Sequence, residues 1–393
     1  MHRSTGLFAG AALAACMLVA APDAAARKLG TLEFEPCSLA PEGLALTVAA
    51  QCATLSVPQD RKAPDGRRIE LAIAWIPNDE GKVADDPVFM LAGGPGQAAR
   101  DSYPLLHGAF AEIRRTRHVI LVDQRGTGGS NRLSCKDPRG DNAFSGDDAL
   151  DVTASVAFAK TCLSQFDADV RHYTTTDAVA DLDDVREAIG AEAIDLVGIS
   201  YGTRVAQQYA RRHPDRTRSV VLDGVVPNTL VLGAEHAKNL EAALDAHFAR
   251  CTAEPKCVER FGSPRANLDA LLAKARAEPQ LVRYRDPQSN APREDRFDAA
   301  TLAAVVRLYA YAPTTGALLP LALHEAAQGR PEELLAQARM LTSLVGESIM
   351  HGMQLSVICS EDASRLGADA ADAATTLGTV LVDLLLAQCA VWP

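Results

Sequence analysis

The sequence lacks an excess of basic residues, a metal-binding cluster of Cys or His, and a long apolar run beyond its first residues. Its 39 Lys and Arg are outnumbered by 50 Asp and Glu, for a net charge of −11. Nucleic-acid binding requires clustered Lys and Arg, so no nucleic-acid partner is expected. Without Cys-x-x-Cys or His-x-x-x-His we expect no zinc site. No feature calls for another cofactor, and no later segment is predicted to span a membrane.

The N-terminus has the pattern of a targeting signal rather than of a folded domain. His2 and Arg3 precede an apolar stretch, and Ala24-Ala25-Ala26 offers a small-residue cleavage site. We predict a signal peptide over 1–26 and an exported protein, periplasmic or secreted. Lipid attachment at Cys16 is the alternative, and it is disfavoured because the residues after Cys16 remain apolar.

Cleavage would leave eight of the nine cysteines, an even number in a compartment that permits disulfides. Their spacing favours bonds between cysteines that are neighbours along the chain. The predicted pairs are Cys37 with Cys52, Cys135 with Cys162, Cys251 with Cys257, and Cys359 with Cys389.

The strongest catalytic signal is Gly198-Ile199-Ser200-Tyr201-Gly202. The apolar residues 194–197 predict a strand ahead of it, and the apolar spacing over 203–212 predicts a helix behind it. A Gly-x-Ser-x-Gly at a strand-to-helix turn is the nucleophile elbow of serine hydrolases. The free N–H groups at the helix N-terminus favour negative charge developing near Ser200.

Two glycine-rich loops follow other predicted strands. Pro87 to Leu91 is a buried strand by its continuous apolar character, and it ends in Gly93-Gly94-Pro95-Gly96-Gln97. This loop is either an ordinary turn or, beside a nucleophile, an oxyanion hole, which we favour. Residues 118–122 predict a second strand, which ends in Asp123-Gln124-Arg125-Gly126-Thr127-Gly128 and lacks the lysine of a phosphate-binding loop.

These three motifs, in this order, resemble the α/β-hydrolase peptidases of the proline iminopeptidase and tripeptidyl aminopeptidase group. The resemblance covers residues 30–225 well and the remainder more loosely. Ala92 stands where many proline iminopeptidases have His, so the exported tripeptidyl aminopeptidases are the more similar branch. The resemblance implies an α/β-hydrolase fold with a mostly parallel sheet. It also implies that Ser200 is the nucleophile and that the N–H groups of Gly94 and Tyr201 form the oxyanion hole.

The predicted elements divide the mature chain into three parts. Residues 27–225 form the hydrolase core, with antiparallel entry strands before parallel ones and a polar surface loop at 136–150. Residues 226–350 form an inserted, all-helical cap that excludes water and selects substrates. Residues 351–393 begin the C-terminal hydrolase segment. The expected cap helices are Glu235–Arg250, Ala266–Ala277, Thr301–Tyr311, Leu318–Gln328 and Pro331–Leu341.

The catalytic base is the missing part of this interpretation. Enzymes of this fold carry their triad in the order Ser, Asp or Glu, then His, yet the residues after Met350 do not read as strands. In similar proteins Cys-x-x-Trp-Pro, here 389–393, precedes the strands that carry Asp and His. We therefore expect the fold to be C-terminally incomplete, with the Asp and His outside this sequence and activity crippled. Histidines expected at the surface or in packing are His213, His236, His247 and His324.

His351, near the end of the predicted cap, is a further candidate for the base, and Asp223 ends the strand after the elbow and is a candidate for a place near the site. His351 is the least unsuitable substitute base, and Asp223 is more simply a turn residue before Gly224.

The function that these features favour is release of residues from peptide N-termini through an acyl-enzyme on Ser200. Glu361 or Asp362 would bind the ammonium group of the peptide, or else both residues are solvent-exposed helix caps. An esterase or lipase of the same fold, acting on small acyl substrates, is the first alternative. A non-catalytic, hydrolase-like binding protein is the second.

Overall fold

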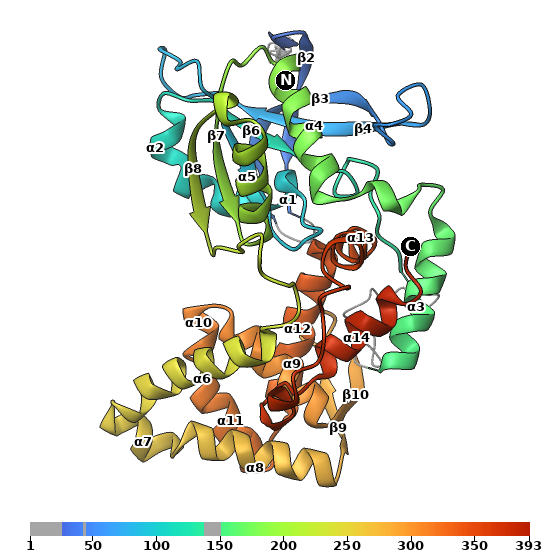
Figure 1. Ribbon diagram of the computed structural model, residues 1–393. Helices are drawn as coiled ribbons and strands as arrows, with labels where there is room; N and C mark the ends of the chain where they lie inside the picture. Colours follow the sequence, from blue (N-terminus) through green and yellow to red (C-terminus); the bar gives the residue numbers. More distant parts are fainter. Residues whose placement is uncertain (1–25, 42–44, 137–150) are drawn as a thin grey trace, which may run out of the picture.

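The computed structural model describes residues 26–41, 45–136 and 151–393 (Figure 1). Within this part, eight strands form one mixed sheet in the order β1-β2-β3-β4-β6-β5-β7-β8. The strands are β1 (Arg27–Leu29), β2 (Leu32–Leu39), β3 (Val48–Pro58), β4 (Arg68–Ile76), β5 (Val88–Leu91), β6 (Val119–Val122), β7 (Ile194–Ile199) and β8 (Thr217–Asp223).

The sheet has an antiparallel half and a parallel half. The pairs from β1 to β4, and β4 with β6, are antiparallel. By contrast, β6, β5, β7 and β8 run parallel. The prediction of antiparallel entry strands ahead of parallel ones is confirmed. All residues of β5 and β6 are buried, as expected of strands covered on both faces.

Helices cover both faces of the sheet. On one face α4 (Thr175–Ala188) and α5 (Tyr201–Arg212) pack into a large apolar cluster, and on the other face α1 (Ala99–Leu106) packs against β5 and β6. Sequence patterns did not predict α3 (Val152–Gln165), which buries only Ser155, Ala159 and Cys162. The remaining short helices are η1 (His107–Phe110), α2 (Ala111–Arg114), η2 (Val170–His172) and η3 (Pro214–Arg216).

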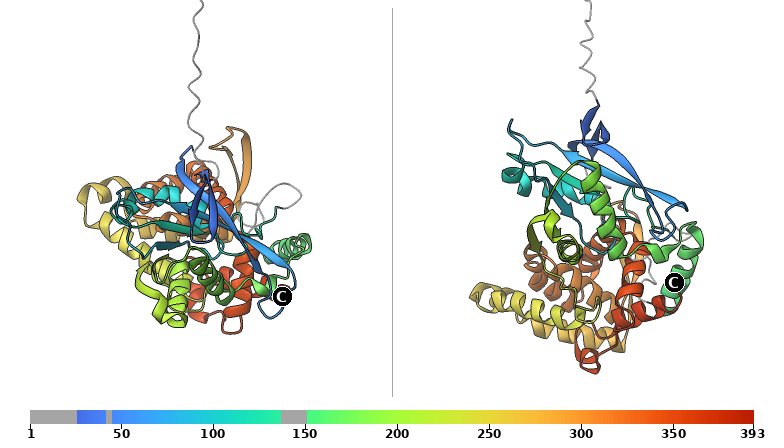
Figure 2. Two further views of the ribbon diagram at one scale, coloured as in Figure 1. Left: turned by 90° about the horizontal axis from the view of Figure 1, so that it is seen from above. Right: turned by 45° about the horizontal axis from the view of Figure 1, so that its top comes forward.

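Residues 226–350, the predicted cap, have an apolar cluster of their own and lie beyond the carboxyl ends of the parallel strands (Figures 1 and 2). Their helices are α6 (His236–Thr252), α7 (Pro255–Phe261), α8 (Pro264–Ala277), α9 (Ala299–Ala310), α10 (Pro313–Gly316), α11 (Leu319–Ala327) and α12 (Glu332–Ser348).

The prediction of an all-helical cap is wrong, because β9 (Gln280–Arg285) and β10 (Pro292–Phe297) form an antiparallel hairpin. Along β9, Val282 and Tyr284 are buried and their neighbours are exposed. This alternation with a period of two was a readable strand signal.

The C-terminal residues contact both parts of the molecule. Helices α13 (His351–Glu361) and α14 (Val380–Cys389) flank the short η4 (Ala370–Ala374), and no strand follows Met350 in the described chain. Leu355 and Trp392 belong to the apolar cluster of the sheet, whereas Leu377 belongs to that of the cap. The segment coloured red in Figure 1 therefore joins core and cap.

All four predicted disulfides are confirmed. Cys37–Cys52 joins β2 to β3, and Cys135–Cys162 joins the chain after β6 to α3. Cys251–Cys257 joins α6 to α7, and Cys359–Cys389 joins α13 to α14.

Some predictions lie outside the described residues. These are the signal peptide, except its last residue, with Cys16, and the surface loop, except its first residue. Among the helices that the structure describes, none has the length and apolar character needed to cross a membrane. The same residues contain no group of three or more His, Cys, Asp or Glu placed to hold a metal ion.

Candidate active site

Ser200 occupies a sharp turn between β7 and α5. Its backbone has φ +54° and ψ −123°, a conformation that residues with a side chain rarely adopt. The turn requires glycine at positions 198 and 202, because neither position has room for a Cβ. A Cβ at Gly198 would lie 2.5 Å from the Gly202 carbonyl oxygen, and one at Gly202 would lie 2.2 Å from the Leu91 carbonyl oxygen. The turn therefore has the geometry of a nucleophile elbow.

The backbone of Ser200 is held while its side chain is left accessible. The Ser200 N–H donates to the Asp223 carbonyl at 2.8 Å, and the Ser200 carbonyl accepts from the Thr203 N–H at 2.9 Å. The Ser200 hydroxyl does not cap α5, and the residue is exposed. Asp223 thus contributes a backbone contact at the end of β8, and its own side chain is exposed.

The first glycine-rich loop lies against the elbow. A Cβ at Gly93 would lie 3.0 Å from the Ser200 Cβ and 3.0 Å from the Gln97 Oε1. Gly94 and Gly96 have φ values of +105° and +107°, and this backbone conformation favours glycine at both positions. The Met350 N–H donates to the Gly96 carbonyl at 2.9 Å, which joins the loop to the end of the cap. Sequence patterns did not signal this contact between distant segments.

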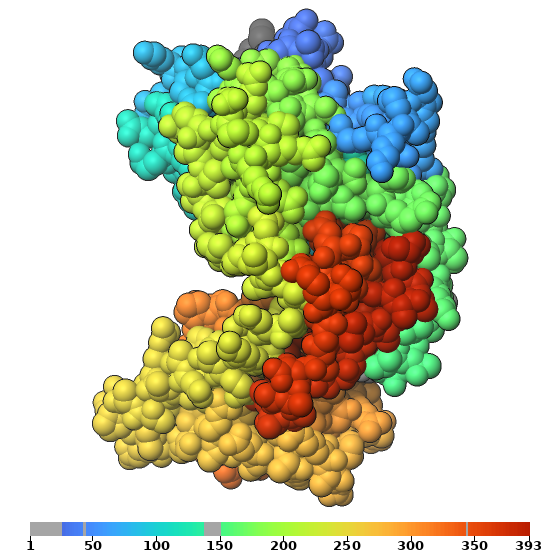
Figure 3. Space-filling model, viewed as in Figure 1, coloured from blue at the N-terminus to red at the C-terminus, as the bar shows by residue number. Residues whose placement is uncertain are grey.

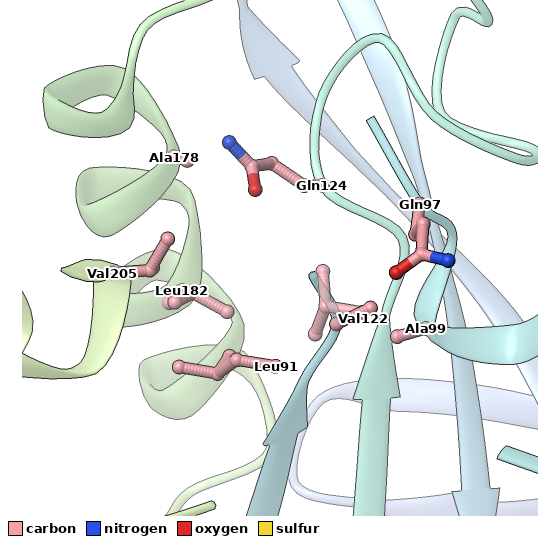
Figure 4. A pocket seen from close by; sticks show the side chains of 9 residues that line it. Leu91, Gln97, Ala99, Val122, Gln124, Ala178, Leu182 and Val205 are labelled. Carbon is pink, nitrogen blue, oxygen red and sulfur yellow. The ribbon is translucent and has the colours of Figure 1, made fainter. Parts of the chain in front are cut away.

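A small cavity lies behind the loop (Figure 4). Its volume of about 20 Å³ holds roughly one water molecule. Gln97 and Gln124 are the polar side chains that line it, together with apolar residues from β5, β6, α4 and α5. An open hollow separates the core from the cap on the side of β8 (Figure 3).

The described histidines contact groups other than Ser200. His351 is buried against Phe158, and its Nε2 lies 3.2 Å from the Gln388 Nε2. Burial lowers the pKa of His351 to about 4. His213 stacks on Tyr209, whereas His247 and His324 contact carbonyl oxygens in the cap.

His236 begins α6, and burial lowers its pKa to about 4 as well. Within the described residues, no histidine hydrogen-bonds to Ser200, so the catalytic base remains unassigned in this part of the chain.

Glu361 and Asp362 have different surroundings. Both oxygens of Glu361 accept hydrogen bonds from Thr175, at 2.7 Å from its N–H and 2.9 Å from its hydroxyl. Burial raises the pKa of Glu361. Asp362 is fully buried and accepts from Arg204 at 2.8 Å and from Arg365 at 2.6 Å. Asp362 is therefore not a solvent-exposed helix cap, because an ion pair with Arg204 occupies it.

Tyr201 follows Ser200 and is the first residue of α5. Its side chain is buried, and its hydroxyl lies 2.6 Å from the Thr175 Oγ1 and 3.2 Å from the Gln124 Nε2. Burial raises the pKa of Tyr201 far above its ordinary value, so the phenol is neutral. Three residues that contact the predicted site residues had no signal in the sequence. Thr175 contacts both Tyr201 and Glu361, Gln124 contacts Tyr201, and Arg204 contacts Asp362.

The order of the strands, the elbow at Ser200 and the two glycine-rich loops are those of an α/β-hydrolase fold. Residues 86–266 match the family model described as the alpha/beta hydrolase fold. Among known proteins the chain is distantly related to the serine protease Hip1 of Mycobacterium tuberculosis. The two are 26% identical over 334 residues, which cover 80% of this chain and 63% of Hip1.

Two further relatives differ in the activity that their names state. The tripeptidyl aminopeptidase of Streptomyces lividans is 29% identical over 197 residues, covering 45% of this chain and 35% of that protein. Carboxylesterase B of Mycobacterium tuberculosis is 29% identical over 224 residues, covering 53% of this chain and 43% of that protein. The matched segments thus span less than two thirds of the length of each of these relatives.

Proposed function

We propose that this protein is an exported serine hydrolase that releases residues from peptide N-termini, with Ser200 as nucleophile. The observation that carries the proposal is the exposed Ser200 on a strained elbow beside a glycine-rich loop. Similarity to Hip1 and to the tripeptidyl aminopeptidase favours a peptide substrate. We further propose that residues 1–26 are removed on export, and that the cap, residues 226–350, covers the site.

The reaction follows from the groups at the elbow. The Ser200 Oγ attacks the scissile carbonyl carbon, its proton passes to a general base, and the N–H groups of Tyr201 and Gly94 stabilise the oxyanion. Collapse breaks the C–N bond, and the base returns the proton to the leaving amine. Water then hydrolyses the acyl-enzyme and regenerates Ser200.

The base and its acidic partner come, in this proposal, from outside the described residues. The support is that no hydrogen bond joins a described histidine to Ser200, and that His351 is buried against Phe158 and Gln388. Loss of a triad member typically lowers turnover by about 10⁴ to 10⁶-fold. In this proposal the described residues supply the nucleophile and the oxyanion hole, and activity depends on a base and an acid that lie outside them.

A fluorophosphonate probe and the intact mass of protein from the native host test this proposal together. We expect the probe to label Ser200, Ser200→Ala to abolish labelling, and Ser164→Ala, which removes an exposed hydroxyl on α3, to leave it unchanged. A mass above that of the 393 residues would account for the base. A folded native protein that the probe does not label would overturn the proposal in favour of a non-catalytic binding protein.

Glu361 is the proposed ammonium site for the peptide. Its side chain is 20% exposed and one of its oxygens lies 3.6 Å from the Arg204 guanidinium. After the two hydrogen bonds from Thr175, the carboxylate retains lone pairs for an ammonium donor. We expect Glu361→Ala to lower kcat/KM more for peptides with a free N-terminus than for blocked ones. An equal loss on both would contradict this role.

An esterase is the second candidate, and the similarity to carboxylesterase B favours it. The chemistry at Ser200 is the same for an acyl ester, so the substrate must decide. A higher kcat/KM for short acyl esters without an amino group than for free peptides would favour the esterase.

A further inference from the structure

A line of buried polar side chains joins Glu361 to the residue after the nucleophile. The Thr175 hydroxyl contacts the Glu361 carboxylate at 2.9 Å and the Tyr201 hydroxyl at 2.6 Å, and Gln124 contacts Tyr201 at 3.2 Å. Thr175 and Tyr201 are buried almost completely. The four residues come from α13, α4, α5 and the loop after β6, so local sequence does not account for their meeting.

The donors and acceptors in this line have one consistent order. The Thr175 hydroxyl has a single proton, which it donates to the Glu361 carboxylate. Its oxygen therefore accepts from the Tyr201 hydroxyl, whose own oxygen accepts from the Gln124 amide. An ionised Glu361 sets the direction Gln124 to Tyr201 to Thr175 to Glu361, and charge-assisted hydrogen bonds are the stronger kind.

We propose that Thr175 and Glu361 are positioning residues for the oxyanion hole, acting through the side chain of Tyr201. This inference rests on the proposed function, in which the Tyr201 N–H stabilises the oxyanion. The carbonyl oxygen of the peptide between Ser200 and Tyr201 accepts hydrogen bonds from the Thr203 N–H at 2.9 Å and from the Thr203 hydroxyl at 2.6 Å. The anchored phenol holds that peptide from its far side, and an oxyanion donor works only when its N–H is correctly placed.

The same helix provides a matched control. Tyr209 on α5 is also buried, and its hydroxyl donates to Asp183 at 2.9 Å. Tyr209→Phe therefore removes a buried phenol hydrogen bond from α5 at a distance from the elbow. A purely structural role for the Tyr201 hydroxyl predicts similar effects from Tyr201→Phe and Tyr209→Phe.

The position of the Tyr201 amide can be measured without catalysis. The chain has seven tyrosines, so ¹⁵N-tyrosine labelling gives a simple amide spectrum, in which Tyr201→Phe identifies the Tyr201 signal. We expect Thr175→Val and Glu361→Ala to move this signal. Thr175→Ser, which keeps the hydroxyl and the N–H, should restore it, and Tyr209→Phe should leave it in place.

The labelling rate of Ser200 supplies the second readout. We expect Thr175→Val and Tyr201→Phe to slow fluorophosphonate labelling about tenfold, less than the loss of a whole oxyanion donor. Tyr209→Phe should change the rate less than about twofold, although it lowers stability similarly.

Two results would overturn the inference: an unmoved Tyr201 signal in folded Thr175→Val, or equal slowing by Tyr209→Phe. If the wild-type protein is not labelled at all, the proposed function fails, and the amide signal alone decides whether Thr175 positions Tyr201.

Discussion

At the scale of single residues, Gly202 is required by space rather than by flexibility. Its φ is not positive, yet a Cβ there would lie 2.2 Å from the Leu91 carbonyl oxygen, which belongs to a buried strand. We expect Gly202→Ala to lower the free energy of unfolding by about 3 kcal/mol or more, because backbone must shift to admit the methyl group. Urea unfolding measures this loss.

The matched control for Gly202→Ala is Gly81→Ala, since no atom lies within 4 Å of a Cβ at Gly81. We expect that change to alter the free energy of unfolding by less than about 0.5 kcal/mol. Similar values for the two variants would show that α5 and β5 adjust more easily than the structure indicates.

The burial of His351 predicts that the stability of the protein depends on pH. Burial lowers the pKa of His351 to about 4, whereas the unfolded chain has the ordinary value near 6.5. Below pH 6.5 the unfolded state binds a proton that the folded state does not, so stability falls as the pH falls from about 7 to about 4. The difference corresponds to about 3 kcal/mol.

Replacement of this histidine tests that assignment. When the pH falls from 7 to 4, we expect the free energy of unfolding to fall by about 3 kcal/mol less in His351→Gln than in the wild-type protein. Urea unfolding at several pH values gives both curves, and other titrating groups cancel in their difference. Parallel curves would mean that His351 is protonated in the folded protein.

At the scale of elements, a buried ion pair joins the elbow helix to α13. Arg204 on α5 contacts Asp362 at 2.8 Å and the Leu230 carbonyl at 2.5 Å, and both charged side chains are almost fully buried. We expect Asp362→Leu to lower the free energy of unfolding by about 3 kcal/mol, because the buried Arg204 charge loses its nearest carboxylate and keeps only Glu361, at 3.6 Å.

The double variant Arg204→Met with Asp362→Leu measures how much of the lost stability comes from the interaction between these two side chains. We expect it to recover part of the lost stability, because an apolar pair replaces the desolvated one, although Glu361 loses Arg204 and Arg365 loses Asp362. Urea unfolding of both single variants and the double variant completes the cycle. Additive losses would show that the two side chains do not depend on each other.

Elements with strong local patterns were predictable, and contacts between distant segments were not. The apolar run of β5 and the apolar spacing along α5 identify both elements, and the Gly-x-Ser-x-Gly pattern locates the elbow. The pairing of Thr175 with Glu361 joins residues 186 positions apart, so no local pattern signals it. The β9–β10 hairpin was missed although its alternation was visible, because the helices around it dominated the interpretation.

At the scale of the whole molecule, the sheet has an open edge beside the elbow. β8 is its last strand in the described residues, so its outer backbone groups have no partner strand there. Val221 on β8 and Val225 just after it are each 54% exposed. Exposed edge strands with apolar side chains are templates for pairing with another chain. We therefore expect the described residues to self-associate through β8 as the protein concentration rises.

Sedimentation velocity over a range of concentrations measures this association. We expect Val221→Lys to weaken it, because a charged side chain on an edge strand opposes pairing. Val258→Lys places the same charge on α7 in the cap, where the valine is 41% exposed, and should leave the association unchanged. If both variants weaken association equally, net charge rather than the β8 edge controls it. If neither does, another surface brings the copies together.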